Sequence, residues 1–141
     1  MPPTSPIASL SEAQLVALLA DPDQLDVWFQ PVIGFDTRSV CGAESLLRAQ
    51  LDGVPVEPIA VIDAAVAAGR MREIGRHVLA RACRAHRAWH DAGHGCVAMM
   101  VNVDATELAA PDLVASTEEV LAQFGVPPDR IVLEITETAI I

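Results

Sequence analysis

Lysine is absent from the 141 residues, and the nine positions counted as Lys or Arg are all arginine. Asp and Glu number nineteen, which gives a formal net charge of −10 at pH 7. A protein that binds nucleic-acid polymers irrespective of sequence needs a basic surface to displace counterions from the phosphates. The acidic balance of this chain therefore argues against a nucleic-acid polymer as its partner.

Cysteine is scarce as well. Cys41, Cys83 and Cys96 form an odd set without Cys-x-x-Cys spacing, which is typical of free thiols in a reducing compartment. The first residues lack the basic and apolar regions of a secretory signal. The longest mostly apolar stretch, residues 56–69, is too short for a membrane span and contains Asp63. We therefore expect a cytoplasmic protein with no membrane partner.

What the chain does contain is apolar sequence, since 52% of its residues are hydrophobic. That is enough for one domain with a real core. Periodicity and breakers predict four helices, over residues 11–21, 60–68, 71–91 and 113–124. Apolar runs predict two strands within 26–48, joined by a turn at 35–39, and further strands at 97–105 and 131–138. Buried strands that alternate with helices indicate an α/β domain with a mostly parallel sheet.

Single polar residues interrupt the predicted strands. Val97, Met99, Val101 and Val103 share one face of their strand by alternation, and Asn102 lies on the other. Glu44 and Glu134 interrupt two other strands in the same way. A carboxylate on a buried strand costs several kcal/mol unless it is paired or binds a cation. One interpretation is an oxygen-ligand site for Mg²⁺, Mn²⁺ or Ca²⁺. The other is that these groups lie at solvated strand ends or pair with arginine.

Three segments together resemble the EAL domain, the family of cyclic di-GMP phosphodiesterases. Residues 29–48, FQPVIGFDTRSVCGAESLLR, are similar to its Gln-Pro strand followed by a Glu-Ala-Leu-x-Arg strand. Residues 99–108, MMVNVDATEL, resemble its V-N-x-S strand and loop, and residues 131–138, IVLEITET, its Glu-Ile-Thr-Glu strand. The resemblance implies a truncated EAL-type TIM (β/α) barrel, roughly its first half, with a mixed, mostly parallel sheet. Residues 1–24 would form an N-terminal tail with a short helix, and residues 25–141 the partial EAL domain.

The resemblance also implies a role for individual residues. Three of them would ligate Mg²⁺ or Mn²⁺, namely Glu44, Asn102 and Glu134. Three would contact the cyclic dinucleotide, namely Gln30, Leu46 and Arg48, and the planar guanidinium of Arg48 suits a phosphate. Glu137 would anchor a neighbouring loop and so be structural. The reaction of the family is metal-dependent hydrolysis of cyclic di-GMP to linear pGpG.

The chain departs from the family pattern in three respects, of which the first is that residues 61–69, VIDAAVAAG, lack the glutamates of the family's acidic helix end. Ser45 replaces the motif alanine, and the sequence stops at Ile141, before the family's later motifs, which include a catalytic lysine. We therefore assign no catalytic residue and expect weak metal binding and no hydrolysis by this chain alone. A second copy or a complementing polypeptide would cover the open sheet edge. The alternatives are a non-catalytic remnant that acts as a binding module, and an unrelated α/β binding module.

Two further groups of residues admit simpler explanations than a binding site. His86, His90 and His94, with Cys83, have spacings that could bind zinc on one helix face. A polar outer helix face, with Cys83 packed against the sheet, explains the same pattern. For Trp28 and Trp89 we expect core or partial-core packing, and a role for Trp28 in stacking on a ligand is the alternative.

Overall fold

The structure is a computed structural model of the chain, and it describes residues 5–135. Its helices are α1 (Glu12–Ala20), α2 (Pro58–Ala67), α3 (Met71–Trp89), α4 (Ala105–Leu108) and α5 (Leu113–Phe124). Its strands are β1 (Leu25–Ile33), β2 (Val40–Leu51), β3 (Val54–Val56), β4 (Ala98–Val103) and β5 (Ile131–Ile135). Within the described part of the chain, no helix is both long and apolar enough to cross a membrane.

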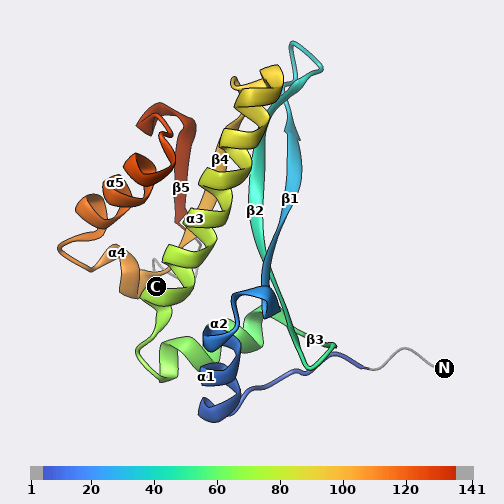
Figure 1. The fold of residues 1–141 in the computed structure, drawn as a ribbon, viewed down its shortest axis with the longest axis vertical. Coiled ribbons are helices and arrows are strands. Elements are labelled where there is room, and N and C mark those ends of the chain that lie inside the picture. Colours follow the sequence, from blue (N-terminus) through green and yellow to red (C-terminus); the bar gives the residue numbers. More distant parts are fainter. Residues whose placement is uncertain (1–4, 136–141) are drawn as a thin grey trace.

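The strands form one mixed sheet in the order β1-β2-β4-β5, and β3 pairs with β2. Strands β2, β4 and β5 run parallel, whereas β1 and β3 pair with β2 antiparallel. In Figure 1, β1 and β2 form a long hairpin at one side of the sheet, and β5 lies at the other. The predicted α/β class and mixed, mostly parallel sheet are confirmed.

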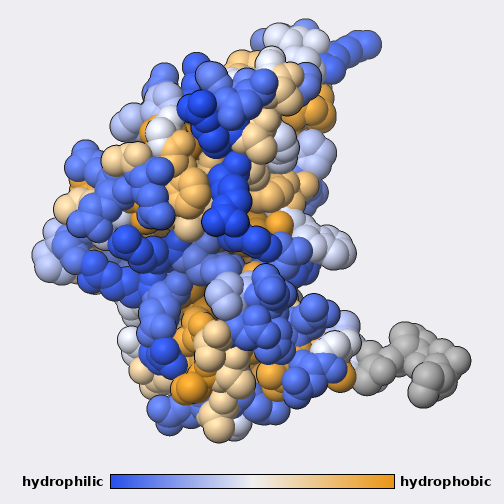
Figure 2. Space-filling model, viewed as in Figure 1, coloured by the Kyte–Doolittle hydropathy of each residue, from blue (hydrophilic) through white to orange (hydrophobic). Residues whose placement is uncertain are grey.

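Helices α3 and α5 pack against each other, and α3 also packs on β1, β2 and β4 (Figure 1). The four residues of β4 and its approach that were predicted to share a face are all buried, namely Val97, Met99, Val101 and Val103. They meet the apolar stripe of α3, which includes Leu79 and Ala82. Hydrophilic residues run along the opposite, solvent-facing side of α3 (Figure 2), because an amphipathic helix turns only one stripe to the core.

Local chemistry explains where the helices begin and end. Ser11 and Gln14 form a reciprocal capping box that starts α1 as predicted. Pro58 opens α2, ahead of the predicted start at Ala60, because the fixed φ of proline suits the first helical turn. Helix α3 ends at Trp89 rather than Asp91, and a distorted turn follows in which Gly93 has a φ of 90°.

Among the strands and α-helices of the described residues, two short elements were not predicted. Strand β3 returns beside β2 through a tight turn in which Asp52 and Gly53 both have positive φ, 51° and 80°. The Asp-Gly pair is a hairpin signal that could have revealed this strand. Helix α4 starts at the break predicted near Asp104, whose side chain accepts a hydrogen bond from the backbone N–H of Glu107.

Ser45 lies on the helix-facing side of β2 and is only 2% exposed. Its hydroxyl group has no hydrogen-bond partner among the described residues. A buried hydroxyl without a partner loses its hydration without replacement, so it destabilises the fold.

We predict that Ser45→Ala leaves the chain as stable or raises its free energy of unfolding by about 1 kcal/mol, because it removes an unpaired buried hydroxyl. Urea unfolding monitored by circular dichroism measures the change. Ser116→Ala is the matched control, since the Ser116 hydroxyl donates to the Leu113 carbonyl oxygen at 3.2 Å. A loss of more than 1 kcal/mol on Ser45→Ala, beyond that of the control, would mean that the hydroxyl is paired in solution.

Candidate functional site

One face of the sheet carries the described residues that the family resemblance assigned to metal or nucleotide binding. Gln30 of β1 lies opposite Glu44 of β2, and Asn102 of β4 lies beside Glu134 of β5. Glu44 is in register with Met100, whose side chain shares a face with that of Asn102. Alternation along the strands then places six candidates on this face: Gln30, Glu44, Leu46, Arg48, Asn102 and Glu134. Glu137, the remaining candidate, lies outside the described residues.

The centre of this face is a contact between β2 and β4. The Asn102 side-chain amide donates a hydrogen bond to Oε1 of Glu44, with a nitrogen–oxygen distance of 3.3 Å. Since the nitrogen of this amide is directed to Glu44, its oxygen is free to accept or to ligate. Glu134 occupies the register position next to Asn102 on β5. Oxygen-bearing side chains from three neighbouring strands therefore lie on one face of the sheet, with Glu134 level with Asn102 and Glu44 two residues before that level.

This donor set fits a hard divalent cation. Carboxylate and amide oxygens suit Mg²⁺ or Mn²⁺, which take six oxygen ligands and keep several waters. Across residues 5–135, no three His, Cys, Asp or Glu side chains cluster as a metal site. Glu44 and Glu134 supply only two carboxylates, and Asn102 would supply the third oxygen. The residues fit the cation in kind, but water or further protein groups would have to complete its coordination.

Arg48 and Trp28 form a second feature of the same face. The Arg48 guanidinium lies 5.2 Å from the centroid of the Trp28 ring, and its Nη1 donates to the Leu47 carbonyl oxygen at 2.8 Å. Trp28 is 61% exposed, so the expectation that it packs in the core is wrong. The physical reason is strand alternation, because Trp28 shares its face with Gln30 rather than with buried Val27. Trp89, in contrast, packs edge-on against Phe29 with ring centroids 5.3 Å apart, as expected.

Within residues 5–135, the histidines do not cluster with other metal-ligating side chains. His86 is 2% exposed, and neither of its ring nitrogens has a hydrogen-bond partner in the described part of the chain. Burial lowers its pKa, the neighbouring His90 lowers it further, and the nearby Gly95 backbone opposes the shift without reversing it. Cys83 is fully buried, as predicted, and burial raises its pKa to about 11, which disfavours the thiolate that a metal would need. The expectation of a polar outer face therefore holds for His90, which is exposed, and fails for His86.

Comparison with known proteins identifies what the chain resembles. It matches the family model of the EAL domain over residues 10–141. It is 34% identical over 131 residues to the cyclic di-GMP phosphodiesterase NbdA of Pseudomonas aeruginosa, and 32% identical over 117 residues to the bifunctional diguanylate cyclase/cyclic di-GMP phosphodiesterase MucR of that organism. These alignments cover 92% and 82% of the chain but only 16% and 17% of the relatives.

Solved structures agree. The PaMucR phosphodiesterase in complex with c-di-GMP matches with a TM-score of 0.81 and 29% sequence identity, over 91% of this chain and 52% of that one. The Xanthomonas citri FimX EAL domain in complex with c-diGMP matches with a TM-score of 0.76 and 27% identity, over 91% of this chain and 49% of that one. The predicted fold, about half of an EAL-type barrel, is confirmed by these matches.

We predict that the buried His86 makes the fold sensitive to acid. Because its pKa in the fold lies below that of the unfolded chain, its contribution to stability is present above pH 6.5 and is lost as pH falls through the lowered value. His86→Leu should therefore lose less stability than the wild type between pH 7.5 and pH 5. Urea unfolding at a series of pH values measures this difference.

The control for this experiment is His94→Gln, since His94 is exposed. The free energy of unfolding of His94→Gln should change with pH as that of the wild type does. Equal pH dependence in His86→Leu and the wild type would show that His86 takes up its proton as easily in the folded chain as in the unfolded one.

Proposed function

Because this chain belongs to the EAL domain family, we propose that the sheet face with Glu44, Asn102 and Glu134 binds cyclic di-GMP together with Mg²⁺ or Mn²⁺. Metal-dependent hydrolysis of cyclic di-GMP is the reaction of this family. The observation that carries the proposal is the hydrogen bond from Asn102 to Glu44, with Glu134 in register on the next strand.

Glu44, Asn102 and Glu134 would hold the cation through their oxygen atoms. The hydrogen bond from the Asn102 amide orients the Glu44 carboxylate along the sheet face, so one of its oxygens is engaged and the other stays free. When bound, a divalent cation neutralises phosphate charge and lowers the pKa of a bound water. Since this chain provides two carboxylates and one amide, we propose that it binds the metal weakly.

Arg48, Trp28, Gln30 and Leu46 would receive the nucleotide. The guanidinium of Arg48 can donate two hydrogen bonds to one phosphate, and its position over the Trp28 ring holds it on the sheet face. An exposed indole offers a flat surface on which a base can stack. Gln30, opposite Glu44, and Leu46, opposite Trp28, complete the strip between the metal ligands and the phosphate site. A charged phosphate and an aromatic base are the two parts of a cyclic dinucleotide.

We further propose that these 141 residues bind cyclic di-GMP without hydrolysing it. They contain no lysine, and they cover about half of the solved EAL structures that they match. On β5, Val132, Leu133 and Ile135 are 41%, 37% and 47% exposed, although all three are apolar. A second copy of the chain or a complementing polypeptide that pairs with β5 would cover this edge. Glu137, beyond the described residues, would anchor a neighbouring loop. We also propose that the protein is cytoplasmic.

A non-catalytic binding module is the second candidate function. The same incomplete set of metal ligands favours it. The first candidate is half of a phosphodiesterase, and the two candidates differ in whether a complementing polypeptide produces hydrolysis. In the first, an added second half of the barrel restores hydrolysis. In the second, cyclic di-GMP binding is the whole function and no added segment produces pGpG.

We predict that isothermal titration calorimetry detects cyclic di-GMP binding, and that Arg48→Ala weakens it about tenfold or more, because a charge-assisted hydrogen bond contributes about 1.5–3 kcal/mol. Arg84→Ala is the matched control. Its guanidinium lies 5.9 Å from the Phe124 ring centroid on the helix-bearing side of the sheet, so affinity should not change. If no heat of binding appears with or without Mn²⁺, the ligand proposal is wrong.

We predict that Mn²⁺, followed by electron paramagnetic resonance, binds the wild type weakly and that Glu44→Gln and Glu134→Gln each reduce the affinity several-fold, because each removes one of two carboxylates. Glu118→Gln, at an exposed position on α5, should leave it unchanged. Chromatography of the same samples after incubation with cyclic di-GMP should find no pGpG. Turnover by the purified chain would contradict the proposal that hydrolysis needs a second half.

A further inference from the structure

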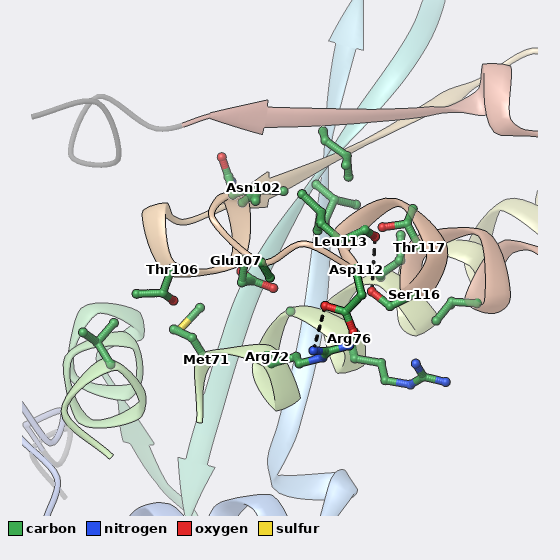
Figure 3. Close-up of a pocket in the computed structure, with 18 of the residues that line it drawn as sticks. Met71, Arg72, Arg76, Asn102, Thr106, Glu107, Asp112, Leu113, Ser116 and Thr117 are labelled. Atoms are coloured by element: carbon green, nitrogen blue, oxygen red, sulfur yellow. Dashed lines mark hydrogen bonds and ion pairs between the residues drawn. The ribbon is translucent and has the colours of Figure 1, made fainter. Parts of the chain in front are cut away.

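A cavity of about 240 Å³ lies on the other side of the sheet, where α3, α4 and α5 meet the end of β4 (Figure 3). Apolar side chains form much of its lining, among them Leu79, Val101, Val103 and Leu133. Glu107 of α4 is one of two carboxylic acids in this lining, and the other, Asp112, is paired with Arg72. Figure 3 shows Glu107 between α4 and α3, with Asn102 at the end of β4 and directed away from it.

The Glu107 carboxyl group occupies a notch on α3 that only glycine leaves open. A Cβ atom placed on Gly75 would overlap Oε1 of Glu107 and lie 2.6 Å from its Cδ. No side chain at position 75 could coexist with Glu107 in this position. Glycine within a helix lowers helix stability, so a glycine there calls for a packing reason. The Glu107 carboxyl group gives such a reason, because it lies where the Cβ atom of any other residue 75 would be.

The same side chain ties α4 to the end of β4. The Asp104 carboxylate accepts from the backbone N–H of Glu107 at 2.8 Å, and the Glu107 carboxyl accepts from the backbone N–H of Asp104 at 3.5 Å. Asp104 directly follows β4, whose Asn102 donates to Glu44 on the opposite face of the sheet. Glu107 thus connects the strand that carries Asn102 to the backbone of α3.

We propose that Glu107 is a positioning residue, which holds the end of β4 against α3 by filling the notch at Gly75 and so keeps Asn102 within reach of Glu44. The inference rests on the proposed function of the sheet face, because the value of this position is the placement of Asn102. Among the described residues, the hydrogen bonds of Glu107 go to Asp104 and not to the proposed metal ligands. Its effect on ligand binding is therefore indirect.

The protonation state of Glu107 decides how well it fits this notch. Desolvation raises its pKa to about 7, the Asp104 amide opposes this shift, and the Asp104 charge adds to it. The other charged groups that line the cavity are Arg72, Arg76 and Asp112. Arg72 is paired with Asp112, and Arg76 with Glu119 of α5, so neither arginine is committed to Glu107.

The sign of the pH effect follows from this raised pKa. Because the folded-state pKa exceeds the unfolded value of 4.5, the contribution of Glu107 to stability is complete below pH 4.5 and is lost as pH rises through about 7. Glutamine has the shape of the protonated acid and cannot ionise. Glu107→Gln should therefore keep the end of β4 in place above pH 7, where the wild type loosens.

A double-mutant cycle at pH 6 tests the notch. If Gly75 were an ordinary helix position, Gly75→Ala would raise the melting temperature, because alanine is the better helix former. If Glu107 fills the notch, Gly75→Ala lowers the melting temperature, and Gly75→Ala combined with Glu107→Ala recovers part of the loss. Ala88→Gly, at an exposed position of α3, measures the size of the helix-propensity effect in this helix. A rise in melting temperature for Gly75→Ala alone overturns the proposal.

Hydrogen exchange and ligand binding test the positioning. At pH 8, amides of residues 101–105 should exchange several-fold faster in the wild type than in Glu107→Gln. Between pH 6 and pH 8, the wild-type affinity for cyclic di-GMP should fall several-fold, while that of Glu107→Gln stays level. Equal exchange in the two proteins overturns the positioning role. Absence of cyclic di-GMP binding at both pH values rejects the proposed function instead, because the exchange and melting experiments do not use the ligand.

Discussion

The in-register parallel pairing of β2, β4 and β5 is the constraint on which the candidate site depends. Asn102 is paired with Glu134, and Glu44 with Met100 one pleat earlier, so the three oxygen-bearing side chains emerge on one face of the sheet. A register slip of a single residue would turn the affected side chain to the opposite face. The buried valines of β4 prevent such a slip, because it would expose them to water. The packing of the apolar face thus secures the geometry of the polar one.

Polar side chains are in different environments on the two sides of the sheet. On the helix-bearing side, Ser45 and His86 have no side-chain hydrogen-bond partner among residues 5–135, and burial raises the pKa of Glu107. On the other face, Glu44 and Asn102 bond to each other and remain in reach of solvent or a ligand. Polar side chains are therefore stable on the face that the helices do not cover, which is also where a charged nucleotide and a cation can approach.

Sequence periodicity predicted much of the fold, because the residues that a strand or helix turns to the core have to be apolar. The apolar alternation of residues 97–103 matches the buried face of β4, and the capping pattern after Ser11 marks the start of α1. Elements that depend on few residues were missed, namely β3 with its Asp-Gly turn and the four-residue helix α4. The exposed position of Trp28 could have been inferred, because Trp28 lies two residues before Gln30 on the same strand and so shares its face. The meeting of Gly75 and Glu107 could not, since neither residue carries a signal that it contacts the other.

By itself, the sequence determined which residues can carry chemistry and which strand face each one occupies, because side-chain alternation is a local property of an extended backbone. The three motifs and their order were likewise sufficient for the resemblance to the EAL domain. Only the tertiary structure decided which strands are neighbours, that the Asn102 amide bonds to Glu44, and that Glu107 fills the notch at Gly75. These contacts join residues far apart in the chain, and they form only when the packing of the whole domain brings their strands and helices together.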